Sequence, residues 1–108
     1  MTIDELNIDY LKGKWHTDDL HFLFVWDQGV RLYKTKMDYI KVVNPEGMVA
    51  PVRCPVSNVE YSNKAPSFHY DEKDHKYWLS EDVAIIGVDE DRLFVQCGDN
   101  LIGPFKKD

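Results

Sequence analysis

Hydrophobic and polar residues alternate along most of the chain, in short runs separated by turn-forming residues. The run at residues 21–26 is typical, because Phe22, Phe24 and Trp26 share one face of a strand and the residues between them share the other. Such runs recur about every eight to twelve residues with no helical segment between them. The pattern predicts a mainly β fold, a small antiparallel barrel of about eight short strands between residues 15 and 106.

The first dozen residues follow a helical spacing instead. Apolar side chains at positions 3, 6, 10 and 11 fall on one face of a helix. Thr2 stands three positions before Glu5, as in a capping box, and Gly13 suits the end of a helix. We therefore expect a short N-terminal helix over residues 3–12 that leads into the first strand.

Turn signals place the hairpins of the predicted barrel. Asp27–Gly29 and Asn44–Gly47 are expected turns, with strands at 30–37 and 39–43 between them. The segment that follows, residues 48–59, contains two prolines, so we expect any strand there to lie at an edge or to be broken. Two further hairpins, at residues 67–80 and 83–97, and a final strand at 101–106 complete a single domain that covers residues 1–108.

Both ends of the chain resemble a known superfamily. Gly13-Lys14-Trp15, after a predicted helix, resembles the opening of the lipocalin-like barrels of the calycin superfamily. The stretch Ile85–Val95, continued by Phe105–Lys107, resembles the last two strands of small bacterial lipocalin-like domains. The resemblance implies that Trp15 plugs one end of the barrel, with Lys106 or Lys107 over its indole ring.

Composition narrows the function classes. The 108 residues include 13 Lys or Arg and 19 Asp or Glu, a formal net charge of −6. The densest basic stretch, Arg31–Lys36, has only three cations, which argues against nucleic acid as a partner. No apolar run approaches the roughly 20 residues of a membrane span. The acidic N-terminus lacks the pattern of a signal or transit peptide, so we expect a cytoplasmic protein with no membrane partner.

Candidate chemistry is sparse. The four histidines lack the spacing of a zinc site, and the serines lack a nucleophile elbow. His21–Phe24 and the turn after it resemble one hairpin of the phenolic acid decarboxylases, but the later catalytic carboxylate of that family has no equivalent here. We expect no enzyme activity, no metal and no cofactor. Cys54 and Cys97 share faces with valines, which predicts free, buried thiols.

The aromatic content indicates a first function, the binding of a small ligand. There are 3 Trp, 6 Tyr and 5 Phe, most of which we expect in the core, but the strand at residues 31–37 has a mixed pattern. If Arg31 and Tyr33 point inward, they line a pocket for a small apolar or anionic ligand. The predicted ligand-binding residues are Trp26, Arg31, Tyr33 and Trp78. The alternative is that side chains fill the barrel, which an eight-stranded barrel allows.

Acidic turns indicate a second function, the binding of a basic protein. Two predicted hairpin tips carry three carboxylates each, and alternate hairpins open at the same rim of an up-and-down barrel. The predicted interaction residues are Asp71, Glu72 and Asp74 in one tip, and Asp89, Glu90 and Asp91 in the other. Such a patch suits a cytosolic interaction protein or an immunity-type antagonist whose partner is basic. The alternative is that these turns are acidic for solubility.

Overall fold

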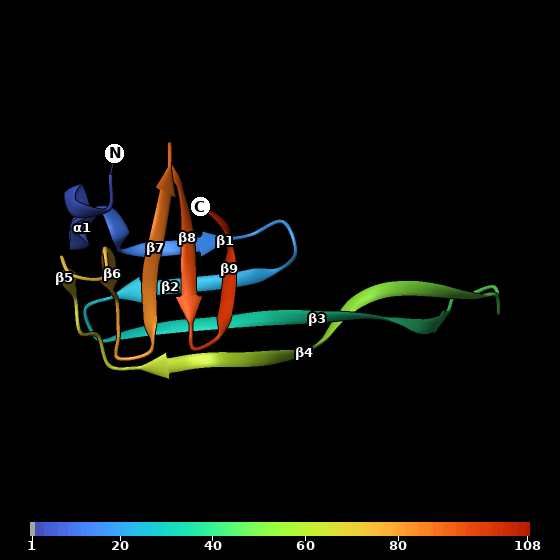
Figure 1. The fold of residues 1–108 in the computed structure, drawn as a ribbon. Coiled ribbons are helices and arrows are strands. Elements are labelled where there is room, and N and C mark those ends of the chain that lie inside the picture. Colours follow the sequence, from blue (N-terminus) through green and yellow to red (C-terminus); the bar gives the residue numbers. More distant parts are fainter. Residues whose placement is uncertain (1) are drawn as a thin grey trace.

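The computed structural model describes residues 2–108, which form one antiparallel sheet of nine strands (Figure 1). Their order across the sheet is β4-β3-β2-β1-β9-β8-β7-β6-β5. The strands are β1 (Gly13–His16), β2 (His21–Trp26), β3 (Gly29–Val43), β4 (Val49–Lys64), β5 (His69–Asp71), β6 (Lys76–Trp78), β7 (Val83–Asp89), β8 (Arg92–Cys97) and β9 (Asn100–Lys107). The prediction of a mainly β, antiparallel fold is confirmed.

The expected closure into a barrel is not found. β4 and β5 are the two edge strands, and no backbone ladder joins them within residues 2–108. Side chains instead join β4 to the connection between β6 and β7: Ser62 donates to Asp82 at 2.7 Å, and Lys64 pairs with Glu81 at 2.7 Å.

The expected N-terminal helix over residues 3–12 is wrong. The segment contains a 3-10 turn, η1 (Ile3–Glu5), and a single helical turn, α1 (Ile8–Leu11), separated by extended backbone at Leu6. The helical turn begins at Asn7, whose side chain accepts a hydrogen bond from the Tyr10 N–H at 2.9 Å. Thr2 bonds the side chains of Asp4 and Glu5 rather than backbone N–H groups, so it does not cap a continuous helix.

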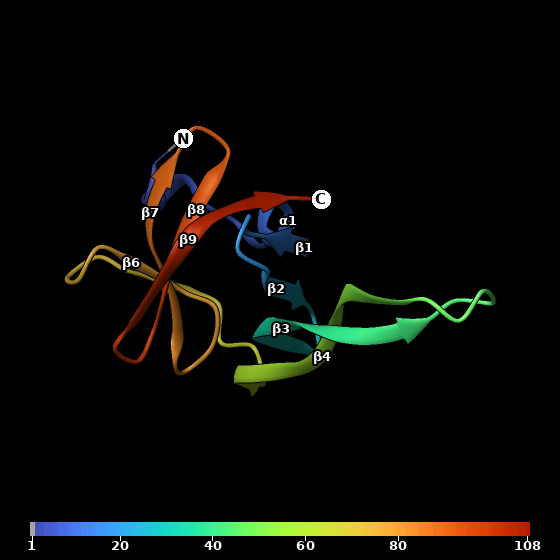
Figure 2. The same ribbon diagram turned by 90° about the vertical axis from the view of Figure 1, so that its right-hand side faces the viewer.

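The core lies on the inner face of the curved sheet, where β7, β8 and β9 cross over β2 and β3 (Figures 1 and 2). Alternate residues of each strand point inward, as the period of two requires. Among them Leu23, Leu32, Leu93, Val95 and Phe105 are fully buried. Side chains therefore fill the space that the sheet encloses.

Trp15 closes this core beside the N-terminal segment. Its side chain is 1% exposed, and its indole N–H donates to the Leu11 carbonyl at 2.9 Å. The Lys107 ammonium lies 5.5 Å from the centroid of the indole ring and also donates to the Tyr10 carbonyl at 2.6 Å. The expected basic side chain over the indole is thus confirmed, and it is Lys107.

The β3–β4 hairpin extends far beyond the rest of the sheet. β2 pairs with β3 only as far as Lys34, and from there β3 pairs with β4 alone. We call residues 36–57 the arm and the remaining residues the body. The arm is visible as the ribbon that leaves the body in Figures 1 and 2, and it gives the molecule extents of 62 × 27 × 25 Å. The Cα radius of gyration is 17.2 Å, against about 13 Å for a compact chain of this length.

The arm corrects one sequence prediction and confirms another. The separate strands at 30–37 and 39–43 are one continuous strand, whereas the segment with the prolines is an edge strand of 16 residues, one of the two outcomes expected for it. Pro51 pairs with Lys41 in a regular part of the ladder, and Pro55 pairs with Met37 beside a register shift between Lys36 and Met37. Prolines are tolerated there because β4 has a neighbour on one side only.

Candidate functional site

Three of the four predicted ligand-binding residues share one surface, but it is the outer face of the sheet. Leu23 and Leu32 point inward, so Trp26, Arg31 and Tyr33 point outward from β2 and β3. The expected inward pocket is therefore wrong, because the pattern fixes which residues share a face and not which face is covered. Side chains fill the interior, as the alternative prediction held.

Trp78 lies apart from the other three residues. It is on β6, near the opposite edge of the sheet. Its ring stacks on His69 with centroids 6.5 Å apart, and its indole N–H faces the Asp71 carboxylate at 3.5 Å. The side chain borders an open hollow of about 260 Å³ together with Glu81 and Gln96. The four residues consequently do not form one pocket.

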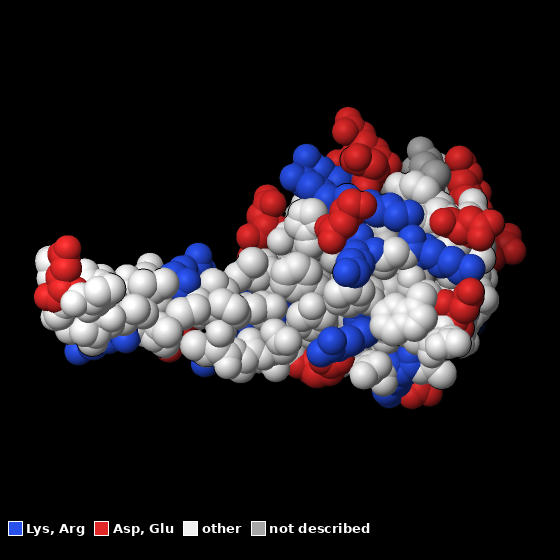
Figure 3. Space-filling view, turned by 180° about the vertical axis from the view of Figure 1, so that it is seen from behind, with Lys and Arg blue, Asp and Glu red and all other residues white. Residues whose placement is uncertain are grey.

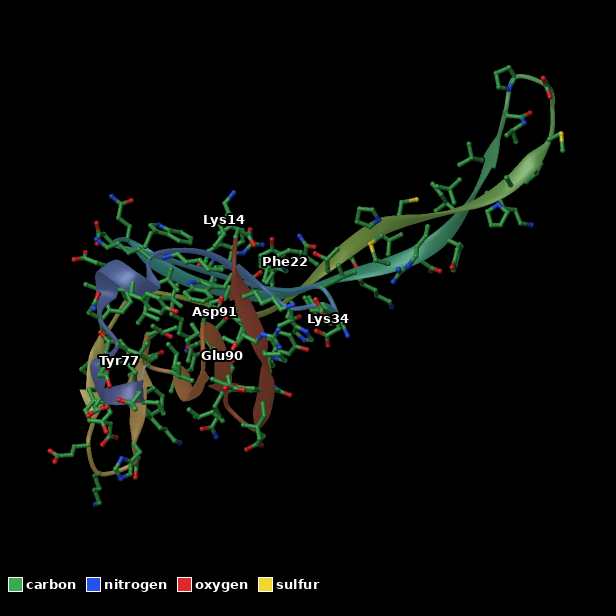
Figure 4. The ribbon with its side chains drawn as sticks, turned by 90° about the horizontal axis from the view of Figure 1, so that it is seen from above. Lys14, Phe22, Lys34, Tyr77, Glu90 and Asp91 are labelled. Atoms are coloured by element: carbon green, nitrogen blue, oxygen red, sulfur yellow. The ribbon has the colours of Figure 1, made fainter. Side chains whose placement is uncertain are left out.

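Sequence reasoning missed a cluster of stacked rings around Tyr33. The Tyr33 ring stacks on Phe22 and Phe24, with centroids 5.3 and 5.8 Å away, and Trp26 meets Phe24 edge to face at 6.2 Å. We call Phe22, Phe24, Trp26 and Tyr33 the aromatic cluster. Figure 4 shows Phe22 beside Lys14, whose ammonium lies 5.5 Å from the Phe24 ring. The equal apolarity of both faces of residues 21–26 is the signal for it.

Arg31 covers the aromatic cluster and is itself held by a carboxylate. Its guanidinium carbon lies 4.3 Å from the centroid of the Tyr33 ring. Its Nε and Nη2 donate to the two carboxylate oxygens of Glu60 at 3.0 and 3.1 Å. This hydrogen-bonded pair raises the pKa of Arg31 further above its ordinary value. The guanidinium is thus neutralised by Glu60, which weakens the case for an anionic ligand here.

The two acidic tips both flank the N-terminal segment but point in different directions, since in Figure 2 the β5–β6 turn projects sideways and the β7–β8 turn points upward. The N-terminal segment lies between them, because Ile3 borders a hollow of about 540 Å³ with Tyr70 and Val88. It adds two further carboxylates to those of the tips. The acidic rim, as we call it, comprises Asp4, Glu5, Asp71, Glu72, Asp74, Asp89, Glu90 and Asp91.

Members of the acidic rim differ in what they do. The Asp71 carboxylate accepts hydrogen bonds from the backbone N–H groups of Asp74 and Lys73 at 3.2 and 3.1 Å. These bonds lower the pKa of Asp71, with the Asp74 N–H as the largest cause. Asp71 therefore organises its turn. Glu90 and Asp91 are exposed at the other tip and free to meet a partner (Figure 4).

The histidines and cysteines occupy separate places. His21 is buried, stacks on Tyr61 at 5.7 Å and donates a hydrogen bond from Nδ1 to the Asp19 carboxylate at 2.9 Å. Within residues 2–108 no three potential metal ligands come together. Both cysteines are free, as predicted, and Cys97 is buried. The prediction of burial is wrong for Cys54, since it lies half-buried in the arm, where valines alternate without a core to cover them.

The arm is the most unusual surface of the molecule, and sequence reasoning did not find it. Its apolar side chains are exposed on both faces: Tyr39 by 66% and Val43 by 64% on one face, and Ile40 by 47% on the other. Few charged side chains lie along its middle, whereas they crowd the body (Figure 3). Ile40, Val42 and Val52 share the face that continues the inner face of the sheet. A contiguous exposed apolar surface of this kind is typical of an interaction site.

Comparison with known proteins adds no relative. No protein-family model, curated protein or solved structure matches this chain. No helix within the described residues is both long and apolar enough to span a membrane.

Proposed function

We propose that this chain is a non-catalytic domain that binds another protein, with the acidic rim facing a basic surface of the partner. The observation that carries the proposal is the filled interior. Leu23, Leu32 and Phe105 occupy the space that a lipocalin-like domain would use for a ligand, so contacts must be made outside. The lipocalin-like assignment is itself a proposal, supported by the Trp15–Lys107 contact at one end of the sheet.

The charges of the rim favour a basic partner. The rim gathers eight carboxylates from three segments, and the cations nearest to it in the sequence are Lys73, Lys76 and Arg92. Complementary charge accelerates the encounter of two proteins and fixes their relative orientation. Because such charges act over a Debye length of about 8 Å at physiological salt, binding should weaken as salt is added.

Charge reversal tests the proposal. One variant changes Asp89, Glu90 and Asp91 to Lys. A matched control changes three exposed turn carboxylates away from the rim, Asp18, Asp27 and Asp99, to Lys, so that both variants have a formal net charge of zero. We expect proteins captured from cytosol at low salt by the parent and the control to be lost with the rim variant. Equal loss in both variants, or no loss in either, would refute a role for the rim.

A second candidate function rests on the aromatic cluster. Its stacked rings offer an outer platform for a flat apolar ligand, with Trp26 42% exposed at one end. Titration with the uncharged ring compound 2-naphthol, followed by NMR shifts, should move the signals of Phe22 and Tyr33 and not those of Trp78. A Tyr33→Ala variant should abolish these shifts. Shifts spread evenly over the surface, or retained in the variant, would exclude this candidate.

A further inference from the structure

The arm exposes about as much extra surface as one side of a stable interface buries. The accessible surface is 6940 Å², whereas a compact monomer of 12.7 kDa exposes about 6,200 Å². The excess of about 700 Å² is close to the roughly 800 Å² that each partner contributes to an interface of standard size. A two-stranded hairpin also gains little stability on its own in water. The exposed surface of the arm is therefore large enough for an interface, and contact with a partner would stabilise the hairpin.

The ladder shows which backbone groups of the arm face outward. The Asn44 N–H donates to the Met48 carbonyl at 2.9 Å, so this pair is hydrogen-bonded. Antiparallel pairs alternate between hydrogen-bonded and non-hydrogen-bonded, so the N–H and C=O groups of alternate β3 residues point away from β4. These residues are Met37, Tyr39, Lys41 and Val43. The Tyr39 N–H agrees, since it donates to the neighbouring Asp38 carboxylate at 2.8 Å instead of to β4.

Prolines block the opposite edge of the arm. The same alternation directs the backbone groups of residues 49, 51, 53 and 55 to the free edge of β4. Pro51 and Pro55 have no N–H to offer there, and proline is a common device against the addition of another strand. The β3 edge has no proline from residue 36 to residue 43. A further strand can thus be added beside β3 and not beside β4.

We propose that two copies of this chain pair through the arm, β3 against β3, as an antiparallel dimer with a two-fold axis at Ile40. In such a dimer each residue of one β3 pairs with a residue of the other β3, and the two residue numbers always add up to the same sum. That sum is even, because paired residues must lie on the same face of the sheet. When the sum is 80, all four residues whose backbone groups point outward are paired. Met37 then lies opposite Val43 of the partner subunit, and Tyr39 lies opposite Lys41 of the partner subunit. The dimer would then contain a continuous four-stranded sheet, a common mode of strand addition.

Side chains fit this register. Ile40 meets Ile40 of the partner subunit at the axis as a non-hydrogen-bonded pair, in which side chains approach most closely. On the other face, Lys41 lies across from the Tyr39 ring of the partner subunit, as a cation–π pair requires. The aliphatic side chains of Ile40, Val42 and Val52 form a shared surface across the four strands.

A hollow lies where the partner's arm would end. In this register Asn44 of the partner subunit comes opposite Lys36. There a hollow of about 410 Å³ is lined by the Asp18–Leu20 loop, β3 residues 34–37 and Arg53. Figure 4 shows Lys34 where the arm leaves the body. Glu46, the one charged residue of the tip turn 44–48, would reach a site that holds both cations and carboxylates.

Net charge favours contact between arms over contact between bodies. The arm has three cations against two carboxylates, whereas the body has ten against seventeen. The proposed dimer keeps the acidic bodies at opposite ends of the paired strands, about 23 Å apart for seven residues at about 3.3 Å each. This separation exceeds two Debye lengths of about 8 Å, so repulsion between the bodies is largely screened. The acidic rim is not used, so the dimer does not depend on the function proposed above.

Two proline variants provide a matched test by analytical ultracentrifugation. Lys41→Pro and Arg53→Pro each remove one cation and one outward N–H, the first from the β3 edge and the second from the β4 edge. We expect the parent and Arg53→Pro to sediment as dimers, and Lys41→Pro to raise the dissociation constant by about tenfold or more, through lost hydrogen bonds and the proline ring. A monomeric parent, a dimeric Lys41→Pro variant or equal losses in both variants would overturn the proposal.

Charged substitutions of Ile40, at the two-fold axis, test the register of the two β3 strands. Unlike the proline variants, they do not require the arm to accommodate a proline. Ile40→Lys places two lysines face to face across the axis, and Ile40→Asp two aspartates. We expect each variant alone to be monomeric and an equimolar mixture of the two to dimerise. Near-ultraviolet circular dichroism checks that the body remains folded. If Ile40→Lys still dimerises alone, or the mixture stays monomeric, the Ile40-centred pairing is wrong. A parent that is monomeric, yet pairs with a strand of some other protein, would also contradict it.

Discussion

The two halves of β3 have the same alternation of residues and opposite surroundings. In the body half, Val30 and Leu32 are fully buried under β7–β9. In the arm half, Ile40 and Val42 continue the same face but are 47% and 41% exposed. Alternation fixes the face on which a side chain lies, whereas burial depends on whether another layer of the chain reaches that face. The comparison teaches that an apolar strand face which no other part of the chain covers is a surface for contact with another molecule.

The largest expected loss of stability comes from the closure of the body. Trp15→Ala should lower the free energy of unfolding by about 3–5 kcal/mol, because a fully buried indole and its hydrogen bond to Leu11 are removed. Urea denaturation followed by circular dichroism measures it. Trp26→Ala is the control, since that side chain is 42% exposed and should cost far less. A Trp15→Ala variant that unfolds at the parental urea concentration would show that this end of the core is not closed by the indole.

A pair of substitutions on β3 tests the two halves directly. Leu32→Ala should destabilise the chain by about 2–5 kcal/mol, because it leaves a cavity in the packed core. Ile40→Ala should change stability by less than about 0.5 kcal/mol at concentrations where the chain is monomeric, since no core surrounds it. Thermal unfolding at low protein concentration compares them. Similar losses in both variants would mean that the arm is covered in the single chain.

Thiol reactivity gives a third comparison of body and arm. Cys54 in the arm should react rapidly with a thiol reagent in the native state. Cys97 should react only on unfolding, because burial shields it and raises the pKa of its thiol. A Cys54→Ser variant identifies the fast phase in a DTNB time course. Two slow phases, or a fast phase that survives in the variant, would contradict the placement of Cys54.

The smallest expected effect concerns acid stability at Asp19, in the loop before β2. Hydrogen bonds from Thr17 and His21 lower the pKa of Asp19 from its ordinary value of 3.8. The ionised carboxylate therefore stabilises the folded state above that value, and this contribution disappears as the pH falls through the lower, folded pKa. Asp19→Asn should lose less stability than the parent below about pH 4. Denaturation curves from about pH 5 downward measure the difference, and parallel losses would show that this carboxylate adds nothing.

Local signals in the sequence predicted the strands and turns well. The turns at Asp27–Gly29, Asn44–Gly47 and Asp89–Asp91 lie where Gly, Asn, Asp and Pro indicated them, because turn chemistry is set by neighbouring residues. The predicted helix is wrong because the backbone is extended at Leu6 and Asn7, and Asn7 caps a separate helical turn. The aromatic cluster was predicted in part: Trp26, Arg31 and Tyr33 share a face, on the wrong side of the sheet.

Long-range arrangement could not be predicted from the same signals. Trp78 is separated from Tyr33 because strand order, which no local pattern specifies, places β6 near the far edge of the sheet. The arm was missed for the same reason, since its valines and Ile40 have the spacing of a core strand. Only the two prolines of β4 marked it as an edge.

Residue-resolved hydrogen exchange at two protein concentrations tests most directly whether the arm is covered only by a second copy. At low concentration the outward N–H groups of Met37, Lys41 and Val43 should exchange rapidly, while those of Leu23 and Val25 in β2 exchange slowly. At high concentration the three arm groups should become protected and the two β2 groups should not change. Arm groups that are as protected as β2 at the lowest concentration, or that exchange rapidly at every concentration, would contradict a dimer formed through the edge of β3.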